Sequence, residues 1–389
     1  MYRDISNERE TPALRVLHIV ESLDRGAVET WLIRTLGHAR KNQKRLDWTF
    51  YCTLERPGVM DDTARSIGAS VIHSKAPLGS KRKFVQSLYN ELKRGEYDIL
   101  HCHHDLVSAV YLLAACGIRL RRRIVHVHNA DESLPTCSQL KRYLCREPMR
   151  QLCLKMADRI VGISNHTLDG FLAGRSRRPE HDSVQYYGVD IEPFQRVVAD
   201  RARFRRECDL PSGSLILLFA GRIVPEKNPV FVIDVLARLR HIQPNAFAVF
   251  VGSGSLSEHV IARAKALGVE DSIRLLGWRS DIAEIMSCSD WFILPHPEYP
   301  PEGFGLAVVE AQLAGLRMLL SRGVPDDPLL STASFRRLSI TEGPDRWAKA
   351  AVELLQNPAP SRAAASSALG KSPMDMDRAL NDLLSLYAC

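Results

Sequence analysis

Short apolar runs alternate with segments of helical periodicity along most of this chain. The runs are rich in Val, Ile, Leu and Phe, which is typical of strands buried on both faces of a parallel sheet. Such alternation indicates an α/β protein with doubly wound sheets. We predict strands near residues 14–20, 46–52, 69–73, 98–102, 123–127, 159–163, 215–220, 246–251, 272–276, 290–294 and 317–320.

The predicted strands form two groups, separated by a link near residues 191–198 beside Pro193. A chain of 389 residues exceeds the size of one hydrophobic core. We therefore predict two Rossmann-like domains, residues 1–193 and 194–370, followed by a last segment, 371–389, with a helix over 374–387. The Ala/Ser-rich stretch 361–369, preceded by two prolines, predicts a connector to that helix.

Cysteine usage and the amino-terminal sequence predict a cytoplasmic protein. Nine cysteines are scattered without a Cys-x-x-Cys pair, which argues against a disulfide framework. Residues 1–11 are polar and charged and lack the apolar core of a secretory signal. The most membrane-like stretch, 107–118, is too short to span a bilayer.

The net positive charge lies in the first half of the chain. Residues 1–200 hold 31 Lys and Arg against 24 Asp and Glu, whereas the remainder holds 21 of each. No nucleic-acid motif or interleaved aromatic residues accompany the basic clusters, so we expect no nucleic-acid partner. An anionic membrane surface and a set of simply solvated faces both stay open as explanations. The densest clusters are 81–83, 119–123, 141–150 and 175–178.

Two carboxylates, Glu302 and Glu310, flank a Gly-Phe-Gly turn at the predicted start of a helix over residues 306–316. Free N–H groups at a helix start, together with the helix dipole, favour a phosphate. A carboxylate beside them is better suited to accept hydrogen bonds from sugar hydroxyls. The pattern therefore indicates a sugar-nucleotide site, although a solvated loop acid and an ordinary surface helix would give the same spacing by chance.

Basic residues follow the predicted strand over 215–220. Gly221 and Arg222 come directly after it, and Lys227 lies five residues beyond Arg222. Ligands of doubly wound sheets bind at the carboxyl ends of the strands, and an Arg fork with a Lys charge suits a diphosphate. The next strand ends in a second glycine turn, Gly252-Ser253-Gly254.

Three segments of the second half resemble the family 4 retaining glycosyltransferases, in particular those that make capsular and extracellular polysaccharides. These are G-R-I-V-P-E-K, V-G-S-G-S-L and P-E-G-F-G-L-A-V-V-E-A. The first half is similar in its glycine loop at 25–29, Y-D-I-L-H-C-H, I-V-H-V-H-N, A-D-R-I-V-G-I-S and Y-G-V-D. The resemblance covers residues 14 to 316 and extends more weakly to the terminal helix.

This resemblance implies the GT-B architecture, in which two Rossmann-like domains face a cleft and a terminal helix can cross back to the first domain. It implies transfer of a glycosyl unit from a nucleoside diphosphate sugar, with retention at the anomeric carbon. A UDP-sugar is the favoured donor and a GDP-sugar the next, and the acceptor is a lipid-linked or soluble hydroxyl. No cofactor is implied, and the reaction is typically independent of metal ions.

The resemblance also assigns roles to residues of this chain. Arg222 and Lys227 neutralise the leaving diphosphate, Glu302 contacts the sugar hydroxyls, and Glu310 holds the ribose. His128 faces the cleft as the family's active-site histidine. The catalytic candidates are therefore His128, Arg222, Lys227 and Glu302. The donor-binding candidates are Gly26, Arg222, Lys227, Gly252, Gly254, Gly303, Phe304, Gly305, Leu306 and Glu310.

Histidines near the ends of two predicted strands, 98–102 and 123–127, raise the question of a metal site. Imidazole and thiolate are good ligands for transition metals, and His101, Cys102 and His103 are consecutive. Neighbouring side chains on a strand point to opposite faces, however, so Cys102 does not share a face with the two histidines. We therefore expect no metal site, and a structural role for His103 stays as open as a functional one.

Two departures from the family pattern bear on activity. The first glycine loop has Ala27 where the family commonly has glycine, which would strain the chain if that position needs a positive φ. The second turn has Ser253 where an acid is common. Neither departure removes a charged group from the proposed donor site, and a catalytically weak homologue stays open. Two further alternatives stay open beside a transferase, namely a GT-B sugar-nucleotide epimerase and a non-catalytic nucleotide-sugar-binding subunit.

Overall fold

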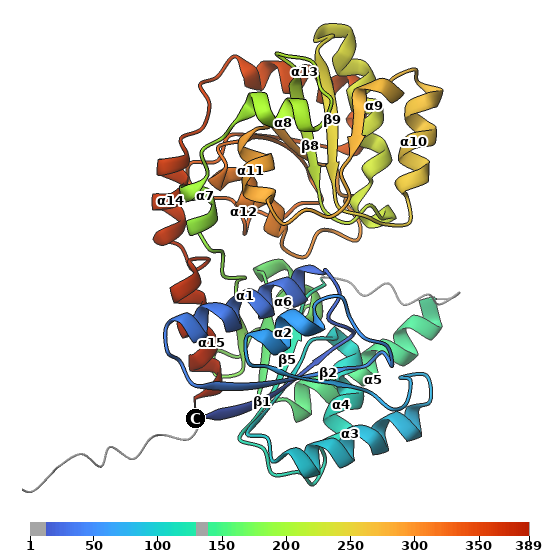
Figure 1. Ribbon diagram of the computed structural model, residues 1–389. Helices are drawn as coiled ribbons and strands as arrows, with labels where there is room; N and C mark the ends of the chain where they lie inside the picture. Colours follow the sequence, from blue (N-terminus) through green and yellow to red (C-terminus); the bar gives the residue numbers. More distant parts are fainter. Residues whose placement is uncertain (1–12, 130–138, 389) are drawn as a thin grey trace, which may run out of the picture.

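The computed structural model describes residues 13–129 and 139–388, so the expectation for residues 1–11 lies outside the described part. Within these ranges the chain forms two parallel sheets, each covered by helices on both faces (Figure 1). The amino-terminal sheet has the order β3-β2-β1-β4-β5-β6-β7, and the carboxyl-terminal sheet the order β10-β9-β8-β11-β12-β13. The predicted class, two doubly wound Rossmann-like domains, is confirmed.

The strands of the amino-terminal sheet are β1 Leu14–Val20, β2 Leu46–Cys52, β3 Ser70–His73, β4 Ile99–Cys102, β5 Arg122–Val127, β6 Arg159–Gly162 and β7 Asp182–Val184. Its helices are α1 Ala27–Lys41, α2 Asp61–Ser66, α3 Lys81–Gly95, α4 Ser108–Ala114, α5 Gln139–Met156 and α6 Asn165–Leu172. Central strands such as β1 and β4 are almost fully buried, which explains their continuous apolar sequence.

The strands of the carboxyl-terminal sheet are β8 Leu215–Ala220, β9 Ala246–Val251, β10 Ile273–Leu275, β11 Trp291–Leu294, β12 Arg317–Ser321 and β13 Phe335–Leu338. Its helices are α8 Arg201–Glu207, α9 Pro229–Ile242, α10 Ser257–Ala266, α11 Ile282–Ser287, α12 Leu306–Leu313 and α13 Gly343–Leu355. Every residue of β9 is buried, as expected of a strand covered on both faces.

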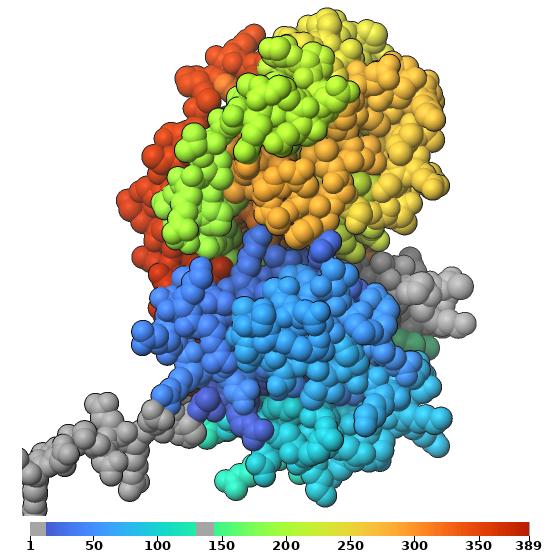
Figure 2. All heavy atoms as spheres, viewed as in Figure 1, coloured from blue at the N-terminus to red at the C-terminus, as the bar shows by residue number. Residues whose placement is uncertain are grey.

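Three helices connect the domains along one side of the molecule: α7 Glu192–Arg196, α14 Arg362–Gly370 and α15 Met376–Tyr387 (Figure 1). α15 packs on α1, and the Tyr387 hydroxyl lies 2.9 Å from Nδ1 of His101. The Gln185 side chain donates a hydrogen bond to the Ala379 carbonyl of α15. The terminal helix therefore contacts the amino-terminal domain, while its chain neighbours belong to the other one. Figure 2 shows the amino-terminal residues in blue against the orange part of the carboxyl-terminal domain.

Three sequence expectations need correction. The stretch 361–369 is not a connector but helix α14, because alanine favours helix and the Ser361 side chain caps its first turn. The short edge strands β7 and β13 were missed, since their sequences, D-S-V and F-R-R-L, are partly polar. The helix after the Gly-Phe-Gly turn ends at Leu313 rather than 316, close to Gly315, which has φ +76°.

Candidate active site

The Arg222 loop packs against the second glycine turn, backbone to backbone. A Cβ at Gly252 would lie 2.0 Å from the Gly221 carbonyl oxygen, and a Cβ at Gly254 would lie 2.3 Å from that of Ile223. Gly252 also has φ +128°, which an L side chain rarely adopts. These two glycines thus allow the loops after β8 and β9 to approach closely. They fix the position of the Arg222 backbone, while the Arg222 side chain is exposed.

Lys227 and Glu302 form an ion pair across two loops of the carboxyl-terminal domain. Nε2 of His296 lies 3.7 Å from Oε2 of the same carboxylate. Burial by itself would raise the pKa of Glu302, but Lys227, His296 and Arg222 together hold that pKa below its usual value. Glu302 is therefore ionised at neutral pH in a largely buried, positively charged setting. The predicted diphosphate and sugar residues adjoin one another.

The Gly-Phe-Gly turn lies at the start of α12. Gly305 has φ +90° and precedes Leu306, the first helical residue, so glycine is the residue suited to this position. The Phe304 ring is buried against Tyr187 of the amino-terminal domain, with centroids 5.5 Å apart. The free backbone N–H groups of this helix start therefore lie at the contact between the domains.

Gly303 makes the tightest contact between the two domains in this turn. A Cβ there would lie 2.3 Å from the carbonyl oxygen of His128, which follows β5. The Gly303 carbonyl in turn accepts a hydrogen bond of 2.7 Å from the Ser164 hydroxyl, at the start of α6. The carboxyl ends of strands from both sheets thus meet at one place, where doubly wound sheets hold their ligands.

Both ring nitrogens of His128 are hydrogen-bonded to other side chains. Nε2 lies 3.0 Å from Nδ1 of His103, and Nδ1 lies 2.8 Å from the Tyr187 hydroxyl. His103 continues the chain through its Nε2 to Nδ1 of His18, at 3.0 Å. A linear network thus runs from the core of the amino-terminal sheet to the domain contact. It fixes the His128 ring, and the His128 peptide carbonyl is the group that touches the other domain.

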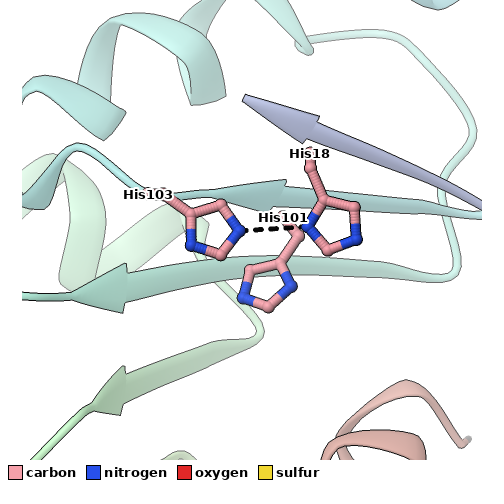
Figure 3. Close-up of side chains that lie close together, drawn as sticks. All are labelled: His18, His101 and His103. Atoms are coloured by element: carbon pink, nitrogen blue, oxygen red, sulfur yellow. Dashed lines mark hydrogen bonds between the residues drawn. The ribbon is translucent and has the colours of Figure 1, made fainter. Parts of the chain in front are cut away.

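Five buried histidines share this face of the sheet: His18, His101, His103, His126 and His128. Nitrogens of two triplets within this set lie within 4.8 Å of one another, a spacing that could hold a metal ion, and a third such group is Cys52, Asp61 and His73. In Figure 3 the His101 ring lies beside the hydrogen bond between His18 and His103 and takes no part in it. Its own nitrogens contact Tyr387 and His126. The rings therefore serve each other as hydrogen-bond partners, and the expectation of no metal stays a prediction.

Burial lowers the pKa of every histidine in this set. For His18 and His126 the pKa falls to about 3, and for the adjacent His104 to about 4. The pKa values of the other three lie well below the usual value, first through burial and then through the neighbouring imidazoles. These side chains are neutral at physiological pH, so their hydrogen bonds run between neutral rings.

Asp105 holds the backbone that carries His128. Its carboxylate accepts hydrogen bonds from the His128 N–H at 2.6 Å and from the Asn129 side chain at 2.7 Å. Asp105 is buried and has φ +44°, an uncommon conformation for a residue other than glycine that often marks functional sites. Burial raises its pKa to about 6, against the effect of these hydrogen bonds.

The glycine loop of the first domain is unstrained. Gly26 is the N-cap of α1 with φ −92°, and Ala27 is the first residue of the helix and has no positive φ. The backbone strain that a positive φ would cause at Ala27 is therefore absent. Burial raises the pKa of Glu29, in the first turn of α1, to about 7, an effect that Arg222 of the other domain opposes. The start of α1 thus lies near the Arg222 loop.

Glu310 lies in the second turn of α12 and is buried. Its Oε1 accepts a hydrogen bond of 2.9 Å from Nη1 of Arg34, a residue of α1 in the other domain. Glu310, like Gly303 and Phe304, therefore contacts the amino-terminal domain. Four further residues belong to this region and were not predicted from the sequence: Arg34, Asp105, Tyr187 and His296. Tyr187 and His296 lie inside or next to the segments that carried the resemblance, whereas nothing in the sequence marks Arg34 in the middle of its helix.

Comparison with known proteins agrees with this architecture. Residues 16–193 match the family model described as Glycosyltransferase Family 4, and residues 200–369 match the model described as Glycosyl transferases group 1. The two matches follow one another along nearly the whole chain and correspond to its two sheets. The chain belongs to the family 4 glycosyltransferases of the GT-B fold.

Individual relatives are similar over most of their length. EpsF of Bacillus subtilis (strain 168), assigned as a glycosyltransferase, is 25% identical over 380 residues, covering 96% of both chains. An Escherichia coli UDP-Gal:α-D-GlcNAc-diphosphoundecaprenol α-1,3-galactosyltransferase is 28% identical over 273 residues, 67% of both chains. The crystal structure of Anabaena HepE with UDP and glucose superimposes with a TM-score of 0.77 at 19% identity, covering 96% of this chain and 98% of that one.

Proposed function

We propose that this glycosyltransferase transfers a sugar from a nucleoside diphosphate sugar to a hydroxyl acceptor, with retention at the anomeric carbon and without a metal ion. A UDP-sugar is the favoured donor and a GDP-sugar the next. The reaction belongs to the assembly of a cell-surface polysaccharide or glycolipid in the cytoplasm. The Escherichia coli relative is named for a UDP-Gal donor and a diphosphoundecaprenol-linked acceptor, and the HepE structure is a complex with UDP and glucose. Both support this choice of donor and acceptor class.

One observation carries the proposal, the contact between Lys227 and Glu302. In a donor, the sugar and its phosphate share a single bridging oxygen, so the groups that bind them must adjoin. A lysine suits the phosphate and an ionised carboxylate suits the sugar hydroxyls. Glu310, in the second turn of α12, is then available for the ribose on the far side of the diphosphate.

The chemistry follows from these roles. The bond between the anomeric carbon and the diphosphate oxygen breaks, and a bond from that carbon to the acceptor oxygen forms on the same face. The acceptor proton passes to the leaving phosphate oxygen, so no side-chain base is required. Arg222, Lys227 and the N–H groups at the start of α12 stabilise the negative charge that develops on the leaving group.

Metal independence rests on the same charges. In many enzymes a divalent cation neutralises the leaving diphosphate. Here two cationic side chains and a helix start supply positive charge at the proposed phosphate position. We therefore expect turnover to persist in excess EDTA, and a loss of turnover that Mg²⁺ or Mn²⁺ restores would contradict this part of the proposal.

A peripheral contact with the anionic inner face of a membrane extends the proposal to a lipid-linked acceptor. Among the described residues no helix is long and apolar enough to cross a bilayer. The first domain carries the excess positive charge. Exposed basic residues such as Lys81, Arg82 and Lys83 at the start of α3 are suited to attract anionic lipids.

A donor screen tests the proposal. The protein is incubated with single UDP- and GDP-sugars, with and without candidate acceptors, and released nucleoside diphosphate is measured while NMR follows the anomeric configuration. We expect release from one donor class and an α-linked product from an α-linked donor. An epimerase would convert the donor sugar without releasing the nucleotide, and a binding subunit would do neither. Either result, or an inverted product, overturns the proposal as stated.

A further inference from the structure

The ion pair between Arg34 and Glu310 joins the two domains at the proposed nucleotide site. Arg34 extends from α1, and its Nη1 lies 2.9 Å from Oε1 of Glu310 in α12. The Glu310 side chain is only 10% exposed, whereas that of Arg34 is 40% exposed. The buried Glu310 carboxylate is thus paired with a partly exposed guanidinium group from the opposite domain.

This contact leaves the carboxylate able to accept further hydrogen bonds. An ionised carboxylate offers about four acceptor positions on its two oxygens, and the bond from Arg34 uses one of them. Glu310 lies in the second turn of α12, so the free N–H groups of the helix start, which belong to its first turn, are not its partners. In the proposed function, two neighbouring ribose hydroxyls would use acceptor positions that the bond from Arg34 leaves free.

We propose that Arg34 is a positioning residue for the donor: it orients the Glu310 carboxylate to accept the ribose hydroxyls, and so couples nucleotide binding to the contact between the domains. This inference rests on the proposed function, because it takes the ribose role of Glu310 from it. A glutamate side chain has several rotamers, and an ion pair that selects one of them lowers the entropic cost of binding. Charge-assisted hydrogen bonds with fixed geometry are the stronger class in proteins.

Binding of nucleoside diphosphates tests this role directly. Calorimetry would compare UDP with 2′-deoxy-UDP, and GDP with 2′-deoxy-GDP, for the native protein and for Arg34→Ala, Arg34→Lys and Glu310→Gln. The control is Arg40→Ala, on the same helix, where the arginine donates to the Gly68 carbonyl at the surface. Thermal unfolding of each variant checks that the fold is intact.

We expect the native protein to prefer the ribonucleotide over its deoxy form by about ten-fold, the size of one hydrogen bond to a charged group. Arg34→Ala should weaken binding of the ribonucleotide about ten-fold and bring the preference close to one. Arg34→Lys should restore part of the preference, and Arg40→Ala should not differ from the native protein. In turnover, Arg34→Ala should raise the donor KM with little change in kcat, because the residue acts on binding.

Two results would overturn the inference while leaving the proposed function standing. Tighter ribonucleotide binding by Arg34→Ala would mean that Arg34 blocks Glu310 instead of orienting it. Equal weakening of both nucleotides, with the preference retained, would mean that Arg34 acts elsewhere than at the ribose. If the folded native protein binds neither UDP nor GDP, the proposed function itself fails and the inference fails with it.

Discussion

The peptide carbonyl of His128 lies directly against Gly303, where a Cβ would come within 2.3 Å of its oxygen. His128 directly follows β5 of the first sheet, and Gly303 precedes the helix start of the second domain. The carbonyl cannot retreat easily, because its chain is fixed by Asp105 through the His128 N–H. We infer that this contact sets the separation of the two halves of the proposed site.

Replacing Gly303 by alanine should therefore reduce transfer about ten-fold to a hundred-fold. The added methyl group would push the helix start away from His128, and misplacement of reacting groups by about an ångström has effects of this size. Steady-state rates with saturating donor would measure the loss. Gly370→Ala is the matched control, since a Cβ there meets nothing within 4 Å. A Gly303→Ala enzyme as fast as the control would show that the contact does not set the site geometry.

Stability should decrease as the pH falls below about 6.5, because seven histidines, six of them buried, have lowered pKa values in the folded state. The unfolded chain binds protons at the ordinary histidine pKa, so unfolding takes up protons below that value. Each group contributes up to about 1.4 kcal/mol per pH unit, between about pH 6.5 and its folded-state pKa.

Asp105 and Glu29 act in the opposite sense. Their pKa values are raised to about 6 and about 7 in the folded state, so the folded protein holds these protons at pH values where the unfolded chain has lost them. Unfolding therefore releases these protons, and the two groups stabilise the fold as the pH falls. Seven histidines outnumber these two carboxyls, and the net effect should be destabilising. Urea unfolding at pH 7.5 and pH 5.5 would measure it. A midpoint that stays constant or rises at the lower pH would mean that the histidines are not buried in neutral form.

Membrane attraction should depend on the basic start of α3 and on salt. Reversal of Lys81, Arg82 and Lys83 to Glu should reduce sedimentation with anionic liposomes, each charge contributing about 1 kcal/mol near the surface. Binding should weaken with added salt, because the screening length is only about 8 Å at physiological ionic strength. Reversal of Lys265 and Lys349, exposed in the other domain, is the control. If the native protein ignores anionic liposomes at low salt, a soluble acceptor replaces the lipid-linked one.

The cluster at residues 121–123 is a poorer target for that experiment than its sequence indicates. Arg121 pairs with Asp98, and Arg122 donates to the Ala388 carbonyl at the end of the terminal helix. Arg123 donates to the Ile118 carbonyl. Reversing these charges would disturb the fold as well as any membrane-binding surface. A loss of liposome binding would therefore not identify its cause.

The sequence predicts the fold well where burial dictates residue type. β8 and β9 are apolar throughout because both faces are covered, and their predicted limits match the structure. Edge strands such as β7 are partly solvated, so they carry mixed residues and were missed. The helix at 362–370 was mistaken for a connector because its prolines lie just before the Ser361 cap, where they do not interrupt it.

The candidate site was only partly accessible from sequence. Residues after strand ends, such as Arg222 and His128, have predictable positions because parallel strands bring their carboxyl ends to one edge. Arg34 and Glu310 are 276 positions apart and meet only because two separate domains pack together. The positive φ of Asp105 and the hydrogen bonds of His128 to two side chains likewise depend on tertiary packing.

The most direct test of the account is the rate of donor cleavage in Arg222→Ala and Lys227→Ala proteins, measured at saturating donor against the native protein. If these cations stabilise the leaving diphosphate, each substitution should lower kcat about ten-fold to a thousand-fold, which corresponds to about 1.4 to 4 kcal/mol of lost stabilisation. Circular dichroism should show an unchanged fold. Near-native kcat in both folded variants would contradict the assignment of the diphosphate site.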